Sequence, residues 1–330
     1  LSSMLFVSHV LLPRFGPRMT GLAVIAFAFA LQIWVFAPNT TLFIALAAPF
    51  SCAFGVIQPA TLAVITQAEA LSGRRLQPLH WASFSAGSLI GLLVGVISQA
   101  LKLPPVLVFG GLFVLTVLVG LYIFMRPFGT VTFKPISSPG FRIPSQTVLF
   151  LGALAAASMA TISIILDWSA LWLTRDLGLT IALGGMGIMA FNFAEIISRL
   201  YGEKLINAFG ESLVAGWGML VGCAIFLIAT MSGNAYLIVI GFGFFGFFTA
   251  NFVPVIFGVA VREETENPIA AVNDVNLLAF VGFLFGPPLI GYIAKSVSIT
   301  ACMIILAVTW GLIAGILMLS RKLNGVSNGA

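Results

Sequence analysis

The sequence is dominated by unbroken apolar runs of about twenty residues each. A helix of that length crosses roughly 30 Å of hydrocarbon, because each residue adds 1.5 Å. Prolines, glycines and polar residues separate the runs and mark where one helix ends and the next begins. Ten complete membrane-spanning helices are predicted, at residues 19–37, 41–66, 81–100, 105–125, 147–173, 181–200, 213–231, 235–258, 269–294 and 298–320.

The composition indicates the same class of protein. Charged residues make up 8% of the chain and apolar residues 60%, whereas a soluble domain carries roughly 25% and 45–50%. So few charges cannot cover a surface that faces water. Transmembrane strands alternate apolar and polar residues over about ten positions, and the continuous apolar runs do not. We therefore expect an all-α integral membrane protein.

The basic residues predict the orientation of the helices, because short cytoplasmic loops are enriched in Lys and Arg. When successive loops are assigned to opposite faces, one face holds Lys102, Arg175 and Lys295. The other holds Arg14, Arg18, Arg74, Arg75, Arg126, Lys134, Arg142, Arg199, Lys204, Arg262, Arg321 and Lys322. We expect the second face, and with it the C-terminus, to be cytoplasmic in a multi-pass protein of the bacterial inner membrane.

The longest polar connection, at residues 126–146, divides the chain into two predicted bundles. The N-terminal bundle, residues 1–125, holds four spans and one partial helix near residues 2–12. The C-terminal bundle, residues 147–330, holds six spans, and residues 126–146 form the central cytoplasmic loop. If the bundles are equivalent, the first helix and part of the second are absent before Leu1.

Equivalent bundles predict an internal repeat, and the sequence contains one. The segment LLPRFG at residues 11–16 resembles LINAFG at residues 205–210, 194 residues later. Two spans further on, Pro59 and Pro254 lie 195 residues apart in equivalent helices. Parallel repeats of six helices are a known plan of secondary transporters.

Several motifs resemble the major facilitator superfamily. The loop HVLLPRFGPR at residues 9–18 is similar to that family's Gly-x-x-x-Asp-Arg-x-Gly-Arg-Arg loop, and RLYGE at residues 199–203 occupies the equivalent loop of the second bundle. Residues 167–173 (DWSALWL), 79–81 (LHW) and 282–291 (GFLFGPPLIG) resemble the fucose-permease-like branch. This resemblance implies two pseudo-symmetric bundles that transport a small polar, sugar-like solute.

Three acidic residues fall within the predicted spans, where an ionisable group costs about 2.5–3.5 kcal/mol or more. Glu195 precedes Arg199 by four residues, so the two share a helix face. They either fasten the helix end or form a gate contact that breaks during transport. Asp167, with Trp168 beside it, either anchors the membrane interface or faces the cavity. Asp274 either complements the dipole of its helix N-terminus or takes part in gating.

The remaining candidates are amides, loop residues and helix breakers. Buried amides join helices or contact a solute, and adjacent prolines bend a helix. The predicted solute-cavity residues are Gln58, Asn192, Asn251, Asn273, Asn276 and Asp167. The predicted gate or latch residues are Arg14, Gly16, Glu195, Arg199, Gly202, Glu203, Asp274, Gly286, Pro287 and Pro288. Gly87, Gly91 and Gly95 are spaced by four and predict a groove for a neighbouring helix.

No motif for nucleotide-driven transport or for catalysis is found in the sequence. We therefore expect a secondary active transporter that is not an enzyme, uses no cofactor or metal and binds no nucleic acid. Its predicted partners are a small-molecule solute, a coupling proton and membrane lipid, and we expect a monomer. The alternative is a transport-inactive membrane sensor or accessory protein that keeps the fold.

Overall fold

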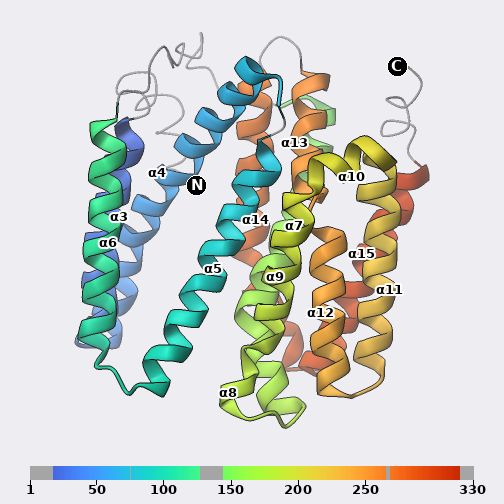
Figure 1. Ribbon diagram of the computed structural model, residues 1–330. Coiled ribbons are helices and arrows are strands. Elements are labelled where there is room, and N and C mark those ends of the chain that lie inside the picture. The colour runs from blue at the N-terminus through green and yellow to red at the C-terminus, as the bar shows by residue number, and fades with distance from the viewer. Residues whose placement is uncertain (1–17, 75, 127–143, 265–267, 320–330) are drawn as a thin grey trace. The chain divides into compact units, whose positions relative to one another are not determined.

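The computed structural model describes residues 18–74, 76–126, 144–264 and 268–319 (Figure 1). These ranges contain helices joined by short turns and no strand, which confirms the predicted all-α class. The described helices form two compact units. The first unit lies within Leu1–Arg74 and Ile97–Ile143, and the second within Arg75–Val96 and Pro144–Ala330.

The first unit is built around α3 (Arg18–Val35), which packs against both α4 (Thr40–Ser72) and α6 (Pro105–Met125). Asn39 caps α4, because its side chain accepts a hydrogen bond from the Leu42 backbone N–H at 2.8 Å. Gly73, with φ +65°, ends the helix in the left-handed conformation that glycine favours. These caps explain why α4 extends beyond the predicted span 41–66.

The second unit contains most of α5 (Gln77–Ala100) and every described helix from α7 onward. Their bounds are α7 (Gln146–Leu171), α8 (Ile181–Gly184), α9 (Met186–Leu200), α10 (Gly202–Phe209), α11 (Gly218–Met231), α12 (Ala235–Thr249), α13 (Phe252–Glu263), α14 (Pro268–Ala294) and α15 (Ile299–Leu319). Short π-helical turns, Trp172–Asp176 and Leu213–Trp217, extend α7 and precede α11. Aromatic side chains of α11 and α12 fill much of its core, with Phe226 stacked on Phe245 at 5.1 Å between ring centres.

The apolar runs correspond well to the observed helices. Eight described helical segments are long and apolar enough to cross a membrane, and Ile299–Gly315 forms a shorter apolar helix. The predicted span 181–200 is interrupted at Gly185, so its main helix, α9, has 15 residues. The predicted span 235–258 is divided into α12 and α13 by a turn at Ala250 and Asn251.

The closest helix contact of the second unit joins α7 and α14, and glycine makes it possible. A Cβ atom placed on Gly282 would lie 1.8 Å from the carbonyl oxygen of Ala156, and one on Gly286 would lie 2.8 Å from that of Ala160. Small residues spaced by four on both helices thus allow the backbones to approach. The predicted groove of α5 is different, because no described atom lies within 4 Å of a Cβ placed on Gly87, Gly91 or Gly95.

Candidate functional site

A buried ion pair on α9 is the centre of the most polar region inside the second unit. Arg199 donates from Nη2 to Glu195 Oε1 at 2.6 Å and from Nη1 to Glu195 Oε2 at 3.1 Å. The two side chains are 2% and 4% exposed. The four-residue spacing places both on one helix face, as predicted, and the paired geometry matches the planar guanidinium to the carboxylate.

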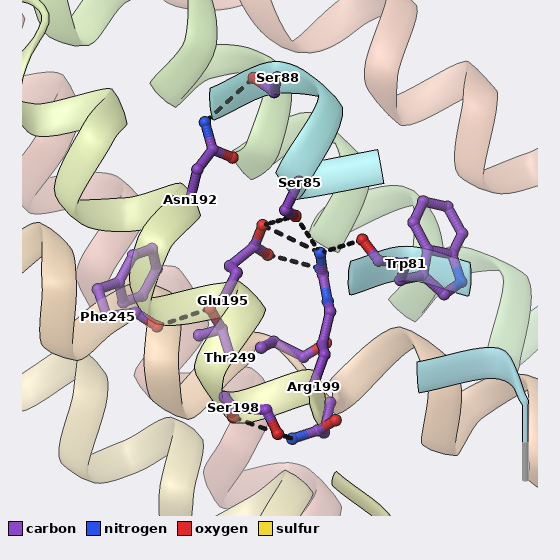
Figure 2. Close-up of polar contacts among 11 residues, drawn as sticks. Trp81, Ser85, Ser88, Asn192, Glu195, Ser198, Arg199, Phe245 and Thr249 are labelled. Atoms are coloured by element: carbon purple, nitrogen blue, oxygen red, sulfur yellow. Dashed lines mark hydrogen bonds and ion pairs between the residues drawn. The ribbon is translucent and has the colours of Figure 1, made fainter. Parts of the chain in front are cut away.

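The start of α5 supplies further partners for both charges (Figure 2). Ser85 donates a hydrogen bond to Glu195 Oε2 at 2.7 Å and accepts one from Arg199 Nη1. Arg199 Nη1 also donates to the Trp81 carbonyl oxygen at 3.0 Å, and the guanidinium carbon lies 6.0 Å from the centre of the Trp81 ring. The ion pair therefore connects α9 to α5 through a charged hydrogen-bond network.

A third element completes the network. Arg199 Nε donates to the carbonyl oxygen of Ala250, at the turn between α12 and α13, at 3.1 Å. One guanidinium thus contacts three separate parts of the second unit. We call Trp81, Ser85, Glu195, Arg199 and Ala250 the Arg199 cluster.

Two buried amides lie beside this cluster and join the same helices. Asn192 donates from Nδ2 to Ser88 Oγ on α5 at 3.1 Å (Figure 2). Asn251 donates from Nδ2 to the hydroxyl and the carbonyl oxygen of Ser198 at 3.0 and 3.1 Å. These bonds agree with a role in joining helices. Solute contact by Asn192 or Asn251 stays a prediction.

Gly202 is required where α10 begins, because Asn251 occupies the space beside it. A Cβ atom on Gly202 would lie 2.5 Å from Asn251 Oδ1 and 3.2 Å from Pro78 Cβ. Asn251 Oδ1 is buried and has no hydrogen-bond partner within the described residues. The two hydrogen bonds from Asn251 Nδ2 to Ser198 fix the position of the amide, so Oδ1 cannot move away from Gly202 without loss of those bonds.

A Gly202→Ala variant is therefore expected to push the Asn251 side chain away from Ser198. The lost hydrogen bonds and the overpacking correspond to a destabilisation of about 1–3 kcal/mol. A thermal melt of the purified protein in detergent measures it. Gly311→Ala is the matched control, since no described atom lies within 4 Å of a Cβ placed there, and equal melting shifts for both variants would contradict the prediction.

The other predicted polar residues are not members of the Arg199 cluster or lie outside the described chain. Gln58 on α4 and Asn276 on α14 are buried, whereas Asn273 and Asp274 are partly buried. Asp167 and Glu203 are exposed. Arg14 and Gly16 lie outside the described residues. The roles assigned to these residues stay predictions.

The proline pair lies inside α14, which continues through it to Ala294. Trp168 on α7 donates from Nε1 to the Pro287 carbonyl oxygen at 3.2 Å. Gly286 is buried against Ala160. Because glycine has no side chain, α7 and α14 can approach closely at this position. A hinge at Gly286, Pro287 and Pro288 stays a prediction.

The sequence did not identify a second ion pair. Arg262, at the end of α13, donates to both carboxylate oxygens of Glu211, at 3.1 and 2.5 Å. Arg262 is 39% exposed, whereas Glu211 is 7% exposed. The two residues are 51 positions apart in the sequence, so no local spacing indicates the pair.

Comparisons with known proteins relate most of the chain to membrane transporters. It is 29% identical over 268 residues to an uncharacterized MFS-type transporter of Yersinia pestis, an alignment covering 79% of this chain and 68% of that protein. It is 29% identical over 315 residues to the membrane protein MosC of Rhizobium meliloti, covering 92% of this chain and 74% of MosC. Residues 205–324 match a family described as "Protein of unknown function (DUF1576)".

The fold resembles that of a solved transporter. The fucose:proton symporter FucP of Escherichia coli superimposes with a TM-score of 0.69 at 16% identity, over 96% of this chain and 87% of that chain. A structure of FucP described as being in the outward conformation superimposes with a TM-score of 0.64 at 17% identity, over 96% of this chain and 88% of that chain.

Proposed function

We propose that this chain, a major-facilitator-type membrane protein that resembles the fucose permeases, is a secondary active transporter for a small polar, sugar-like solute. Transport proceeds by alternating access between the two sequence halves, and a proton gradient drives it. The cytoplasmic side is the one that carries most Lys and Arg residues, including the C-terminus.

The observation that most supports this proposal is the attachment of α5 to α9. In the sequence α5 belongs to the N-terminal half, whereas its residues up to Val96 pack within the second unit. The bonds from Ser85 and the Trp81 carbonyl to the α9 ion pair hold it there. If the halves separate during transport, these are the bonds that must break and form again.

The arrangement suits a contact that opens repeatedly. Glu195 and Arg199 lie on the same helix, so they remain paired when α5 moves away. Neither charge is then left buried and alone, which would cost several kcal/mol. Only the hydrogen bonds to α5 are lost, each worth about 1.5–3 kcal/mol when one partner is charged. The Arg199 cluster thereby acts as a latch on the cytoplasmic side.

Neutral amides favour a neutral polar solute. Asn276 and Gln58 are buried polar side chains in the apolar helices α14 and α4. An amide both donates and accepts hydrogen bonds, as sugar hydroxyl groups do. Few charges lie in the spans to balance a multiply charged solute. A fucose:proton symporter has the same fold, which makes sugars with a proton the first pair to test.

The direct test is transport by purified full-length protein in liposomes. Radiolabelled L-fucose and a panel of other monosaccharides are offered with a proton gradient imposed in either direction. We expect accumulation of at least one sugar, abolished by a protonophore. If no sugar or other small polar solute moves under any gradient, the transporter proposal is wrong and a transport-inactive sensor is favoured.

The two asparagines of α14 give a more specific prediction for the solute site. A variant with Asn273→Ala and Asn276→Ala is expected to lose transport almost completely while its membrane abundance stays near that of the wild type. Initial uptake rates, normalised to protein by immunoblot, measure the effect. The Glu263→Gln substitution, at an exposed residue with no predicted role in transport, controls for nonspecific loss. Wild-type uptake by the double variant would exclude both asparagines from the site.

A further inference from the structure

Pro254 leaves one backbone carbonyl group of the second unit without its helical donor. A proline has no N–H, so the carbonyl four residues earlier lacks the hydrogen bond that a helix would supply. Here that carbonyl belongs to Ala250. Thr249 ends α12 and Phe252 begins α13, so the missing bond coincides with the turn at Ala250 and Asn251. Hydrogen bonding resumes with the Val255 N–H, which donates to the Asn251 carbonyl at 3.1 Å.

Arg199 supplies the missing donor. Its Nε donates to Ala250 O at 3.1 Å, and both residues are almost fully buried, at 3% and 1% exposure. Water is therefore a poor substitute, and an unpaired buried carbonyl is costly. The same guanidinium bonds the Trp81 carbonyl of α5 and the carboxylate of Glu195. The turn between α12 and α13 and the start of α5 thus share one partner.

We propose that Arg199 is a positioning residue that replaces the donor removed by Pro254 and couples the α12–α13 turn to the docking of α5. While α5 is docked, Ser85 and the Trp81 carbonyl orient the guanidinium so that Nε points at Ala250. When α5 leaves, the guanidinium loses two of its fixed partners and the turn loosens. The coupling to α5 rests on the proposed function as a transporter, whereas the replacement of the donor does not.

A double-mutant cycle tests the replacement without any transport measurement. Arg199→Lys keeps a positive charge beside Glu195 but removes the Nε donor, and Pro254→Ala restores a backbone N–H for Ala250. We expect Arg199→Lys to lower the melting temperature in detergent by about 4–8 °C in the native background. In the Pro254→Ala background the same substitution should lower it by less than about half as much. Equal losses in the two backgrounds would overturn the proposal.

Pro288 provides the matched control, because it is also inside a helix but lies on α14 and has no described contact with Arg199. Arg199→Lys and Pro288→Ala are expected to be additive. If the Pro288→Ala background rescued Arg199→Lys as well as Pro254→Ala does, the rescue would be nonspecific and the proposal would fail.

Hydrogen exchange tests the coupling to α5 and remains informative if Arg199→Lys does not fold. Ser85→Ala removes the hydroxyl that orients the ion pair. We expect amide exchange in peptides covering residues 249–255 to become about threefold to tenfold faster, with peptides from α15 unchanged. Adding Pro254→Ala should return that segment to slow exchange. Unchanged exchange in Ser85→Ala would overturn the coupling, even if the protein proves to transport a sugar.

Discussion

An Arg199→Met variant is expected to lose about 3–5 kcal/mol of stability, because it leaves the Glu195 carboxylate buried without its counter-charge. The carboxylate is 4% exposed, and the Ser85 hydroxyl would be its remaining partner in the Arg199 cluster. The bonds to Ala250 and Trp81 are lost at the same time. We expect a large drop in melting temperature in detergent and a lower yield of monodisperse protein.

Two comparisons make this result specific to the buried charge. Adding Glu195→Met to Arg199→Met removes both charges, and it should recover part of the loss, since hydrophobic residues of similar size often replace a buried ion pair well. Arg175→Met breaks the ion pair with Asp176, whose side chains are 72% and 23% exposed, and is expected to cost at most about 1 kcal/mol. A double variant as unstable as the sum of its two single variants would show that charge burial is not the cause.

The sequence predicted the ion pair of Glu195 and Arg199 but not the groups on other helices to which the pair is hydrogen-bonded. A spacing of four within a helix is enough to place Glu195 beside Arg199. Its partners on α5 could not be inferred, because Ser85 lies 110 residues away and serine is common in membrane helices. Nothing about an alanine in a sequence indicates that its backbone carbonyl accepts a hydrogen bond from a distant side chain. Only Pro254, marked by the internal repeat, indicates that a carbonyl in that region needs a donor.

The apolar runs predicted the helices well, because a membrane-spanning helix needs about twenty consecutive, mostly apolar residues, and such runs are visible in a sequence. The comparisons also confirm the resemblance to the major facilitator superfamily. Within it, residues 282–291 indicated the fucose-permease-like branch most specifically. Interruptions within a run were missed. At Gly185 and at the turn before α13 the helical hydrogen bonding is interrupted, while the sequence around each interruption stays apolar. An analysis of hydrophobicity therefore cannot detect them.

The spacing of the glycine residues did not predict which helix surfaces pack against each other. Gly87, Gly91 and Gly95 have the spacing of a packing groove, yet a Cβ atom placed on any of them would meet no other described helix within 4 Å. Gly286, predicted to form a hinge with Pro287 and Pro288, lies directly against α7, as does Gly282. Small-residue spacing indicates where backbones can approach. Which of these surfaces another helix covers depends on tertiary packing, which is not encoded in the local spacing.

Gly282→Ala is expected to be among the most damaging single-methyl changes in the chain. Its Cβ would lie 1.8 Å from the Ala156 carbonyl oxygen, 2.5 Å from the carbonyl carbon and 2.8 Å from the Ala156 Cα. These are backbone atoms, so no side chain can rotate to make room. The helices α7 and α14 must separate, which also strains the neighbouring contact of Gly286 with Ala160. We expect a loss above about 3 kcal/mol, the upper end of ordinary overpacking.

Gly91→Ala is the matched control, since it adds the same methyl group to a helix where no described atom lies within 4 Å. It should be neutral or slightly stabilising, because alanine favours helix more than glycine does. Melting temperature and monodisperse yield, compared across wild type, Gly91→Ala and Gly282→Ala, separate steric overlap from helix propensity. A Gly282→Ala protein that melts at the same temperature as the wild type would contradict the close contact between Gly282 and the Ala156 backbone. A defect in Gly91→Ala would instead reveal a helix packed into the α5 groove.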